Sequence, residues 1–298
     1  MQHIKGILNE EHIRELEESH KRFLQKKEKE RLAHAAPVTV SLPAMVVDEI
    51  CPVCKNAGFT NGGFEGNKTS VIPCSRCMPR RRAQNAATRQ VQLVDRVFGG
   101  PQIPYRARNW EFATFPAEGD QNAKFIVEGF VKMHRDGKDE QGKRGIYIAG
   151  KLGRGKTGLA ICALKAFIEA GQLSLFVSVP DLMDRLRAAA FNKDADENPD
   201  ELLKAVTDVP FLAFDDLGVE KPTAYVLEKF YLIIDKRLSK GLYTLFTSNL
   251  STKDLEAYWR PPGLQAEVFH PGLRIVERIR EYCQGVSIKG GNLRDAGW

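Results

Sequence analysis

Residues 145–171 read GIYIAGKLGRGKTGLAICALKAFIEAG and contain the most informative pattern of the sequence. A short apolar run is followed by a glycine-rich turn and then by apolar residues at helical spacing. Strand, glycine turn and helix in this order are typical of a phosphate-binding loop, because glycines let backbone N–H groups approach an anion at the N-terminus of a helix. We therefore expect an α/β fold in which this loop holds a nucleotide.

Four residues of the turn satisfy the spacing GxxxxGK[ST], namely Gly150, Gly155, Lys156 and Thr157. In such a loop the lysine brings a positive charge to the β- and γ-phosphates, and the threonine hydroxyl binds Mg²⁺. The alternative is a chance glycine turn, but a strand before it and a helix after it favour nucleotide binding. The residues predicted to bind ATP and Mg²⁺ here are Gly150, Gly153, Arg154, Gly155, Lys156, Thr157 and Gly158.

Two carboxylates end a second apolar run, VPFLAFDDLG, at residues 209–218. The second half of a phosphate site is a carboxylate at the end of another strand, so Asp215 would hold the Mg²⁺-bound water shell and Asp216 would polarise the attacking water. A third run, LYTLFTSNLS, ends in Asn249, whose amide can orient the water or contact the γ-phosphate. The alternatives are two solvated aspartates and a turn-forming asparagine.

The C-terminal region supplies arginines for the same site. The helix expected over GLRIVERIREYC, residues 272–283, carries Arg278, which is predicted to act as an arginine finger on the γ-phosphate of a neighbouring subunit. The alternative is a surface ion pair with a nearby glutamate such as Glu281. Arg294, in KGGNLR, is a candidate second phosphate sensor.

The apolar runs GIYIAG, LSLFVSV, VPFLAF and YTLFTSN alternate with helical segments, which predicts a parallel sheet covered by helices. The 298 residues suffice for one such core and a smaller module. The helix expected over residues 9–33 has a single apolar stripe, and it either packs on its own domain or docks on a partner protein. We expect a charged helix in residues 1–35, a zinc-ribbon and basic segment that binds a partner in 36–98, and the ATPase domain in 99–298.

Two CxxC pairs lie 19 residues apart and consist of Cys51, Cys54, Cys74 and Cys77. Each pair places two thiolates on one tight turn, and two such turns complete a tetrahedral Cys₄ site for Zn²⁺. The glycine-rich stretch between the pairs suits a ribbon hairpin, and a redox pair is the alternative. Four sulfur ligands leave no open position, so the zinc would be structural. Cys162 and Cys283 lie on helical patterns and are expected to be packing residues.

The net charge of +6 is concentrated in the cysteine-rich segment, since residues 51–100 hold eight Lys and Arg against two Asp and Glu. Residues 79–100 read as a basic helix, and the segment is either a phosphate-backbone contact or a solvated linker. No apolar stretch approaches the roughly 20 residues of a membrane helix, and the N-terminus lacks the apolar region of a signal peptide. We expect a cytoplasmic protein with no membrane partner.

Together these motifs resemble those of AAA+ ATPases, in particular the DnaC- and DnaI-type helicase loaders and the related IstB transposition helper ATPases. The resemblance covers roughly residues 100–294 and rests on IPYRARNWEFATF, GKLGRGKT, SVPDLMDRLRAA, FLAFDDLG, IIDKRLSKGLYTLFTSNL and RIVERIR. It implies an αβα core, ATP bound between protomers, and assembly into an open ring or spiral around single-stranded DNA. Tyr105 and Arg106 match the segment that borders the adenine, and Asp216 stands where many such ATPases have Glu.

The resemblance also implies a role for residues 180–191, because these ATPases have a helical insertion facing the DNA channel there. Arg185, Arg187 and Phe191 would then contact the backbone and bases of single-stranded DNA. The alternative is an ordinary amphipathic helix with its leucines in the core and its arginines in water. The acidic stretch after it, residues 192–201, is expected to be a solvated loop.

The zinc-bearing N-terminal region is similar to that of DnaI-type loaders, which grip the replicative helicase with this domain. The resemblance therefore implies an ATP-dependent loader that binds a DnaB-type replicative helicase and single-stranded DNA, uses ATP, Mg²⁺ and Zn²⁺, and self-assembles with ATP. One alternative is an IstB-like transposition helper ATPase that binds duplex DNA. Another is a DNA-binding zinc protein whose ATP site is a static switch.

Overall fold

The computed structural model describes residues 51, 53, 55, 59–65, 68–135, 142–191, 197–260 and 270–294. These all belong to the second of the two units into which the chain divides, Thr39–Trp298. The helix expected over residues 9–33 and the second cysteine, Cys54, lie outside the described residues. No helix within the described ranges is long and apolar enough to span a membrane.

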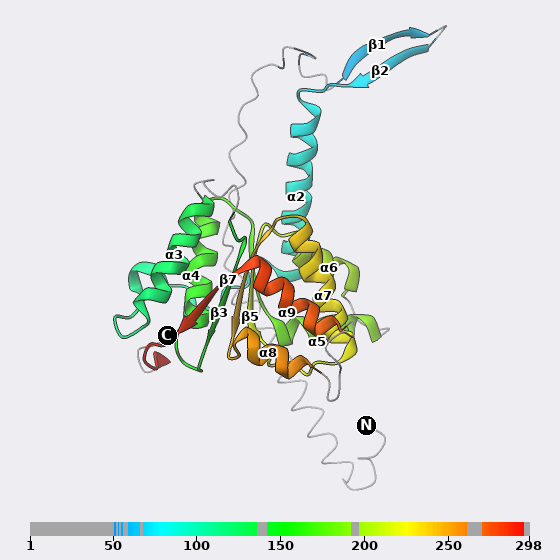
Figure 1. Ribbon diagram of the computed structural model, residues 1–298. Helices are drawn as coiled ribbons and strands as arrows, with labels where there is room; N and C mark the ends of the chain where they lie inside the picture. The colour runs from blue at the N-terminus through cyan, green and yellow to red at the C-terminus, as the bar shows by residue number, and fades with distance from the viewer. Residues whose placement is uncertain are drawn as a thin grey trace, which may run out of the picture. The chain divides into compact units, whose positions relative to one another are not determined.

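Five parallel strands form the central sheet in the order β4-β5-β6-β3-β7 (Figure 1). They are β3 (Gly145–Gly150), β4 (Ser174–Ser178), β5 (Phe211–Leu217), β6 (Tyr243–Ser248) and β7 (Cys283–Ile288). The first four are the apolar runs that predict the sheet. Because β6 lies between β3 and β5, polar residues at the carboxyl ends of β5 and β6 lie beside the loop that follows β3.

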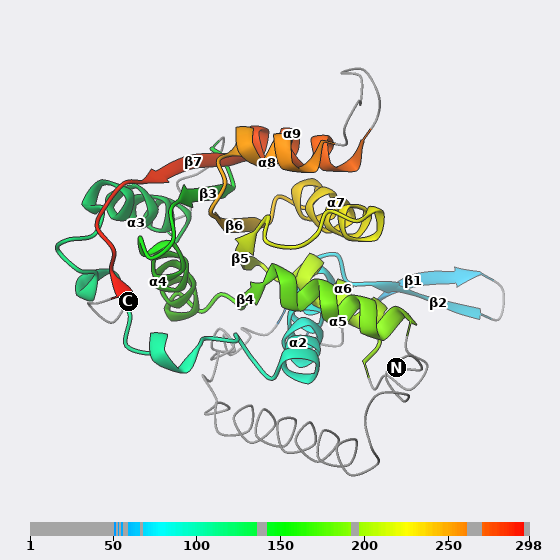
Figure 2. The ribbon, with the colours of Figure 1, turned by 90° about the horizontal axis from the view of Figure 1, so that it is seen from below.

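Helices cover both faces of the sheet (Figure 2). On one face lie α3 (Gln121–Arg135) and α4 (Lys156–Glu169). On the other lie α5 (Val179–Phe191), α6 (Pro199–Asp208), α7 (Ala224–Ser239), α8 (Thr252–Trp259) and α9 (Pro271–Tyr282). The expected αβα core is therefore confirmed.

Side chains of each strand alternate between the two layers of the core, as the pleat of a strand requires. Ile146 and Ile148 of β3 pack with α3 and α4, whereas Tyr147 packs with α7 and α9. The neighbouring β5 follows the same rule, with Phe211 in the first layer and Leu212 in the second. A continuous apolar run is the pattern of a strand buried on both faces, which is why these strands could be predicted.

The fifth strand, β7, is not among the predicted strands. Among the described strands it lies at the edge of the sheet and pairs with β3 alone, and it exposes Gln284 and Gly285, so its sequence lacks a long apolar run. The prediction that Cys283 lies on a helix is wrong, because α9 ends at Tyr282 and Cys283 begins β7. Cys162 lies on α4 and is buried, as expected.

The basic helix expected over residues 79–100 is confirmed as α2 (Met78–Phe98), which ends where Gly99 adopts a left-handed φ of +69°. The acidic stretch 192–201 is not a loop throughout. Its last residues begin α6, because Asn198 caps that helix by accepting the N–H of Asp200 at 2.9 Å. Two short 3₁₀ helices, η1 (Tyr105–Ala107) and η2 (Phe112–Thr114), precede α3.

Between the cysteine pairs, β1 (Phe59–Glu65) and β2 (Lys68–Pro73) form an antiparallel hairpin. This is the ribbon hairpin that the glycine-rich stretch predicts. The backbone also turns after Cys51, whose carbonyl accepts the N–H of Lys55 at 2.7 Å, and after Cys74, whose carbonyl accepts the N–H of Met78 at 3.1 Å.

Candidate functional site

The phosphate loop connects β3 to α4, and two glycines set its shape. Gly153 and Gly155 have φ of +74° and +86°, a conformation that other residues rarely adopt. A Cβ at Gly153 would collide with Asn292 Oδ1, and one at Gly155 would lie 2.8 Å from Leu293 Cδ1. Since the first N–H groups of α4 have no acceptor within the helix, the loop presents backbone donors suited to a phosphate.

Lys156, the first residue of α4, is 6 % exposed. Its Nζ donates to Asn249 Oδ1 at 2.8 Å and to the carbonyl of Lys151 at 3.0 Å. Burial lowers the pKa of Lys156, the two carboxylates at the end of β5 oppose this, and the positive charge of Arg294 adds to it. The structure thus brings the loop lysine and the asparagine that ends β6 into direct contact, although they are 93 residues apart.

Asp215 accepts hydrogen bonds from two threonine hydroxyls. Thr157 Oγ1 donates to its Oδ1 at 3.0 Å, and Thr247 Oγ1 donates to the same atom at 2.5 Å. Burial raises the pKa of Asp215, and the bonds from Thr247 and Thr157 counteract that rise. A hydroxyl and a carboxylate oxygen side by side are ligands of the kind that Mg²⁺ prefers, so these residues fit the expected ion.

Asp216 lies where a bulge interrupts the pairing of β5 with β6. It has φ of +58°, and its N–H donates to Thr247 Oγ1 at 3.1 Å. The next residue along β6, Ser248, donates to the carbonyl of Leu217 at 2.6 Å. The sequence patterns single out Asn249 but not Thr247 or Ser248. The available signal is a polar Thr-Ser pair at the end of a buried apolar strand.

The segment after β7 closes over the phosphate loop. The N–H of Leu293 donates to the carbonyl of Gly153 at 2.7 Å, and the Arg154 guanidinium donates to the carbonyl of Gly290. Arg294 Cγ lies 3.6 Å from the place of a Cβ at Gly153. Arg294 is therefore beside the loop, as a second phosphate sensor would need to be. Arg154 is held by this segment of its own chain.

The two residues expected beside the adenine lie in η1. Tyr105 is 66 % exposed, and the Arg106 guanidinium lies 5.8 Å from the ring centroid of Trp110. Lys165 of α4 donates to the carbonyl of Trp110 at 3.0 Å and so ties this segment to the helix that follows the loop. The role of Tyr105 and Arg106 at the adenine stays a prediction.

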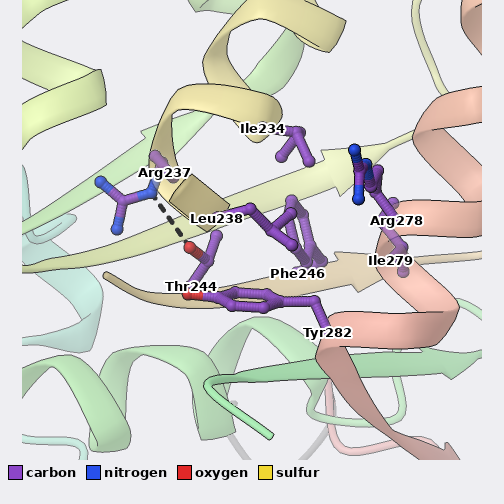
Figure 3. Close-up of a pocket in the computed structure, with 8 residues that line it drawn as sticks. All are labelled: Ile234, Arg237, Leu238, Thr244, Phe246, Arg278, Ile279 and Tyr282. Carbon is purple, nitrogen blue, oxygen red and sulfur yellow. Dashed lines mark hydrogen bonds between the residues drawn. The ribbon is translucent and has the colours of Figure 1, made fainter. Parts of the chain in front are cut away.

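Arg278 lies on the face of α9 that meets α7. Figure 3 shows it beside Ile234 and Ile279, among residues that line a narrow pocket without room for water. Its guanidinium lies 3.5 Å from Asp235 and 3.3 Å from Glu281. These contacts within its own chain are ion pairs of the kind that the alternative interpretation expects for Arg278. Its action on a neighbouring subunit stays a prediction.

The three residues assigned to DNA differ in their surroundings. Arg185 contacts both carboxylate oxygens of Glu197, the shortest distance being 2.6 Å, and its guanidinium lies 4.5 Å from the centroid of the Phe98 ring. Arg185 is therefore not free in water as the amphipathic-helix alternative expects, and its contact with DNA stays a prediction. Arg187 and Phe191 are exposed on α5, so they are accessible for the predicted contact with DNA.

Three of the four predicted zinc ligands are described, and they converge. The sulfur atoms of Cys51, Cys74 and Cys77 all lie within 4.8 Å of one another. Cys51 Sγ and Cys74 Sγ are 3.9 Å apart, close to the roughly 3.8 Å between two sulfurs bound tetrahedrally to zinc at about 2.3 Å. The separation is far longer than a disulfide bond of about 2.05 Å. The triad therefore fits a metal ion, and Zn²⁺ itself stays a proposal.

A parallel sheet in the order β4-β5-β6-β3-β7, with a glycine-rich phosphate loop after β3 and two carboxylates at the end of β5, is the arrangement of AAA+ ATP-binding domains. Residues 140–296, more than half of the chain, match the model of the IstB-like ATP binding protein family. The chain belongs to this family.

The individual proteins that are similar to this chain include replicative helicase loaders. The replicative helicase loader DnaI of Bacillus subtilis (strain 168) is 31 % identical over 172 residues, which are 56 % of this chain and 52 % of DnaI. The replicative helicase loader DnaC of Buchnera aphidicola subsp. Baizongia pistaciae (strain Bp) is 26 % identical over 63 % of this chain and 70 % of its own. A crystal structure of DnaI matches with a TM-score of 0.50 and 25 % identity, over 64 % of this chain and 94 % of that one. The chain is thus a distant homologue of helicase loaders, and it spans about half the length of DnaI.

Proposed function

We propose that the protein is an ATP-hydrolysing loader that places a hexameric replicative helicase on single-stranded DNA. The proposal rests chiefly on one observation: at the carboxyl-terminal edge of the sheet, where β3, β5 and β6 end, four side chains converge, those of Lys156, Thr157, Asp215 and Asn249. Similarity to the DnaI and DnaC helicase loaders supports the choice of partner.

In this proposal each of the polar residues at the carboxyl-terminal edge of the sheet has its own role in ATP binding or hydrolysis. Lys156 neutralises the β- and γ-phosphates, while Thr157 and Asp215 hold Mg²⁺, whose charge offsets that of the phosphates. Asp216 accepts a proton from the attacking water, and Asn249 orients that water. The contact of Lys156 with Asn249 supports these assignments, because the amide lies beside the lysine to which the proposal gives the γ-phosphate.

Residues outside the edge complete the proposed nucleotide site. Tyr105 and Arg106 border the adenine, and Arg294 senses the phosphates from its position beside Gly153. Arg278 reaches the γ-phosphate of the next subunit in an ATP-dependent self-assembly, at the expense of its ion pairs with Asp235 and Glu281. A mixing experiment tests this role, since Arg278→Ala subunits should lower the turnover of parental subunits assembled with them.

The N-terminal part of the chain is proposed to hold the helicase. Residues 1–35 form the charged helix, 36–98 the zinc ribbon and basic segment, and 99–298 the AAA+ domain, in a cytoplasmic protein. Cys51, Cys54, Cys74 and Cys77 bind one structural Zn²⁺. The sulfur separations described above support a metal, and elemental analysis should find about one zinc per chain, lost when Cys74 and Cys77 are both changed to Ser.

The family match favours a second candidate function, that of a transposition helper ATPase which binds duplex DNA and stimulates a transposase. Two measurements separate the candidates. A loader binds a replicative helicase through residues 1–98 and prefers single-stranded DNA. A transposition helper binds duplex DNA more tightly and does not bind the helicase. Nucleotide binding without Mg²⁺-dependent turnover would contradict both and would leave a static ATP switch.

A further inference from the structure

Glu220 follows the two aspartates in the stretch FDDLGVEKPT and is not used by the proposed mechanism. A glutamate between Val219 and Lys221 in a turn is expected to point into water. The structure instead buries it to 9 % exposure, and burial raises its pKa to about 7. Burying an acidic group is unfavourable unless hydrogen bonds compensate, so the partners of this carboxyl group define what it does.

The carboxyl group of Glu220 turns back onto the backbone of its own turn. The N–H of Gly218 donates to Oε2 at 3.1 Å and to Oε1 at 3.3 Å. The backbone N–H groups of Gly218, Val219 and Glu220 itself also counteract the rise in its pKa. Successive N–H groups that converge on one anion form a nest, and here the anion belongs to the chain. The other side of the residue is fixed by Tyr258, whose hydroxyl donates to the Glu220 carbonyl at 3.3 Å.

This turn is the one that carries Asp216. The backbone takes positive φ at Asp216 (+58°) and again at Gly218 (+88°), and the first of these is uncommon for a residue with a side chain. On the side of β6, Thr247 and Ser248 hold the N–H of Asp216 and the carbonyl of Leu217. On the other side, Glu220 holds the N–H of Gly218. The carboxylate of Asp216 is therefore attached to a backbone segment clamped at both ends.

We propose that Glu220 is a positioning residue for Asp216: its carboxyl group closes the turn after β5 and so fixes the direction of the Asp216 side chain toward the phosphate loop. The inference rests on the proposed function, in which Asp216 acts on the attacking water. Glu220 is not a catalytic residue, because its hydrogen bonds go to the backbone and to no phosphate-loop residue. Loss of the clamp leaves Lys156 and Thr157 in place, so nucleotide binding should survive while the rate of hydrolysis falls.

The test compares Glu220→Ala and Glu220→Gln with the parent protein, and uses Lys221→Ala, an exposed neighbour, as the matched control. Two readouts are taken on the full chain, namely amide hydrogen exchange of the backbone at Gly218 and Val219, and ATP turnover with Mg²⁺. Glu220→Ala should speed the exchange by about tenfold or more and lower kcat by about tenfold, with KM and the Kd for ATP changed less than about threefold. Glu220→Gln keeps one acceptor oxygen and should lie between the parent and Glu220→Ala.

The two readouts separate this inference from the proposed function. Unchanged exchange in Glu220→Ala, or faster exchange with parental kcat, would overturn the inference, as would parallel losses in kcat and ATP affinity. A parent protein without turnover would contradict the proposed function, while the exchange still decides whether Glu220 clamps the turn. If Glu220→Ala does not fold, Glu220→Gln carries both readouts alone.

Discussion

Lys156 in the phosphate loop and Arg185 on helix α5 are both basic residues that the sequence assigns to an anionic ligand, but their surroundings in the structure differ. Lys156 donates to Asn249 and to the carbonyl of Lys151, and in the proposed function a phosphate replaces both contacts. Arg185 is paired with the carboxylate of Glu197 and covered by Phe98. A motif that fixes the backbone identifies a binding site, whereas a charge on a helix can equally belong to a structural ion pair.

The largest effect is expected from removing the loop lysine. Lys156→Ala should lower ATP turnover by about 10²–10³-fold, because the charge that develops on the phosphates loses its nearest cation. Lys151→Ala is the matched control, since only its backbone carbonyl contacts Lys156 and its side chain is exposed. Steady-state turnover at saturating ATP measures both. Equal losses in the two variants would show that Lys156 contributes no more to turnover than an exposed lysine does.

The second effect concerns stability and has a defined direction with pH. The folded state raises the Glu220 pKa from 4.5 to about 7, so below pH 4.5 folded and unfolded chains hold the proton alike. Between pH 4.5 and 7 the unfolded chain releases the Glu220 proton while the folded chain still holds it, so rising pH favours the unfolded state. The parent should therefore lose stability relative to Glu220→Gln by at most roughly 3 kcal/mol over this range.

Denaturant unfolding of both proteins at several pH values measures this difference. The comparison of two proteins cancels the contributions of charged groups that both contain, including Asp184, Arg187 and Lys221, which line a cavity together with Glu220. A difference in unfolding free energy that stays constant from pH 4.5 to 7 would show that burial does not shift Glu220 as described.

The third and smallest effect separates the two arginines of α5. Arg185→Ala should cost about 1–2 kcal/mol of stability, because it leaves Glu197 without its partner and uncovers Phe98. Arg187→Ala should cost less than about 0.5 kcal/mol, since its ion pair with Asp184 is exposed.

Binding of single-stranded DNA should show the opposite order. Arg187→Ala should weaken it severalfold and reduce its salt dependence by one contact, and Arg185→Ala should leave it within about twofold. Thermal unfolding and fluorescence titration measure the two properties. If only Arg185→Ala weakened DNA binding, the contact would belong to Arg185, and the expected difference between the two arginines would be reversed.

The sequence predicts those parts of the site that depend on local spacing. The strand–glycine–helix order fixes the loop around Lys156, and apolar runs buried on both faces mark four strands of the sheet. Because parallel strands end at one edge, the polar residues after two of these runs could be assigned to the same site. Asp215 and Asn249 are both found there, in contact with Thr157 and Lys156.

The parts that could not be predicted depend on long-range pairing. Thr247 binds Asp215 only because β5 and β6 are neighbours, and Glu220 is buried only because the turn folds back on itself. The edge strand β7 carries exposed polar residues and so lacks the apolar signal of a buried strand. Arg185 finds its partner in Glu197 across a segment for which the sequence gives no regular pattern.

We have proposed that ATP is hydrolysed where β3, β5 and β6 end beside the phosphate loop. The decisive experiment measures Mg²⁺-dependent turnover of the full chain and of Asp216→Asn in the presence of single-stranded DNA. We expect turnover in the parent and a loss of about a hundredfold in Asp216→Asn, with the Kd for ATP changed less than about threefold, because that side chain acts on water rather than on the bound nucleotide. Turnover in Asp216→Asn equal to that of the parent, or none in the parent itself, would contradict it.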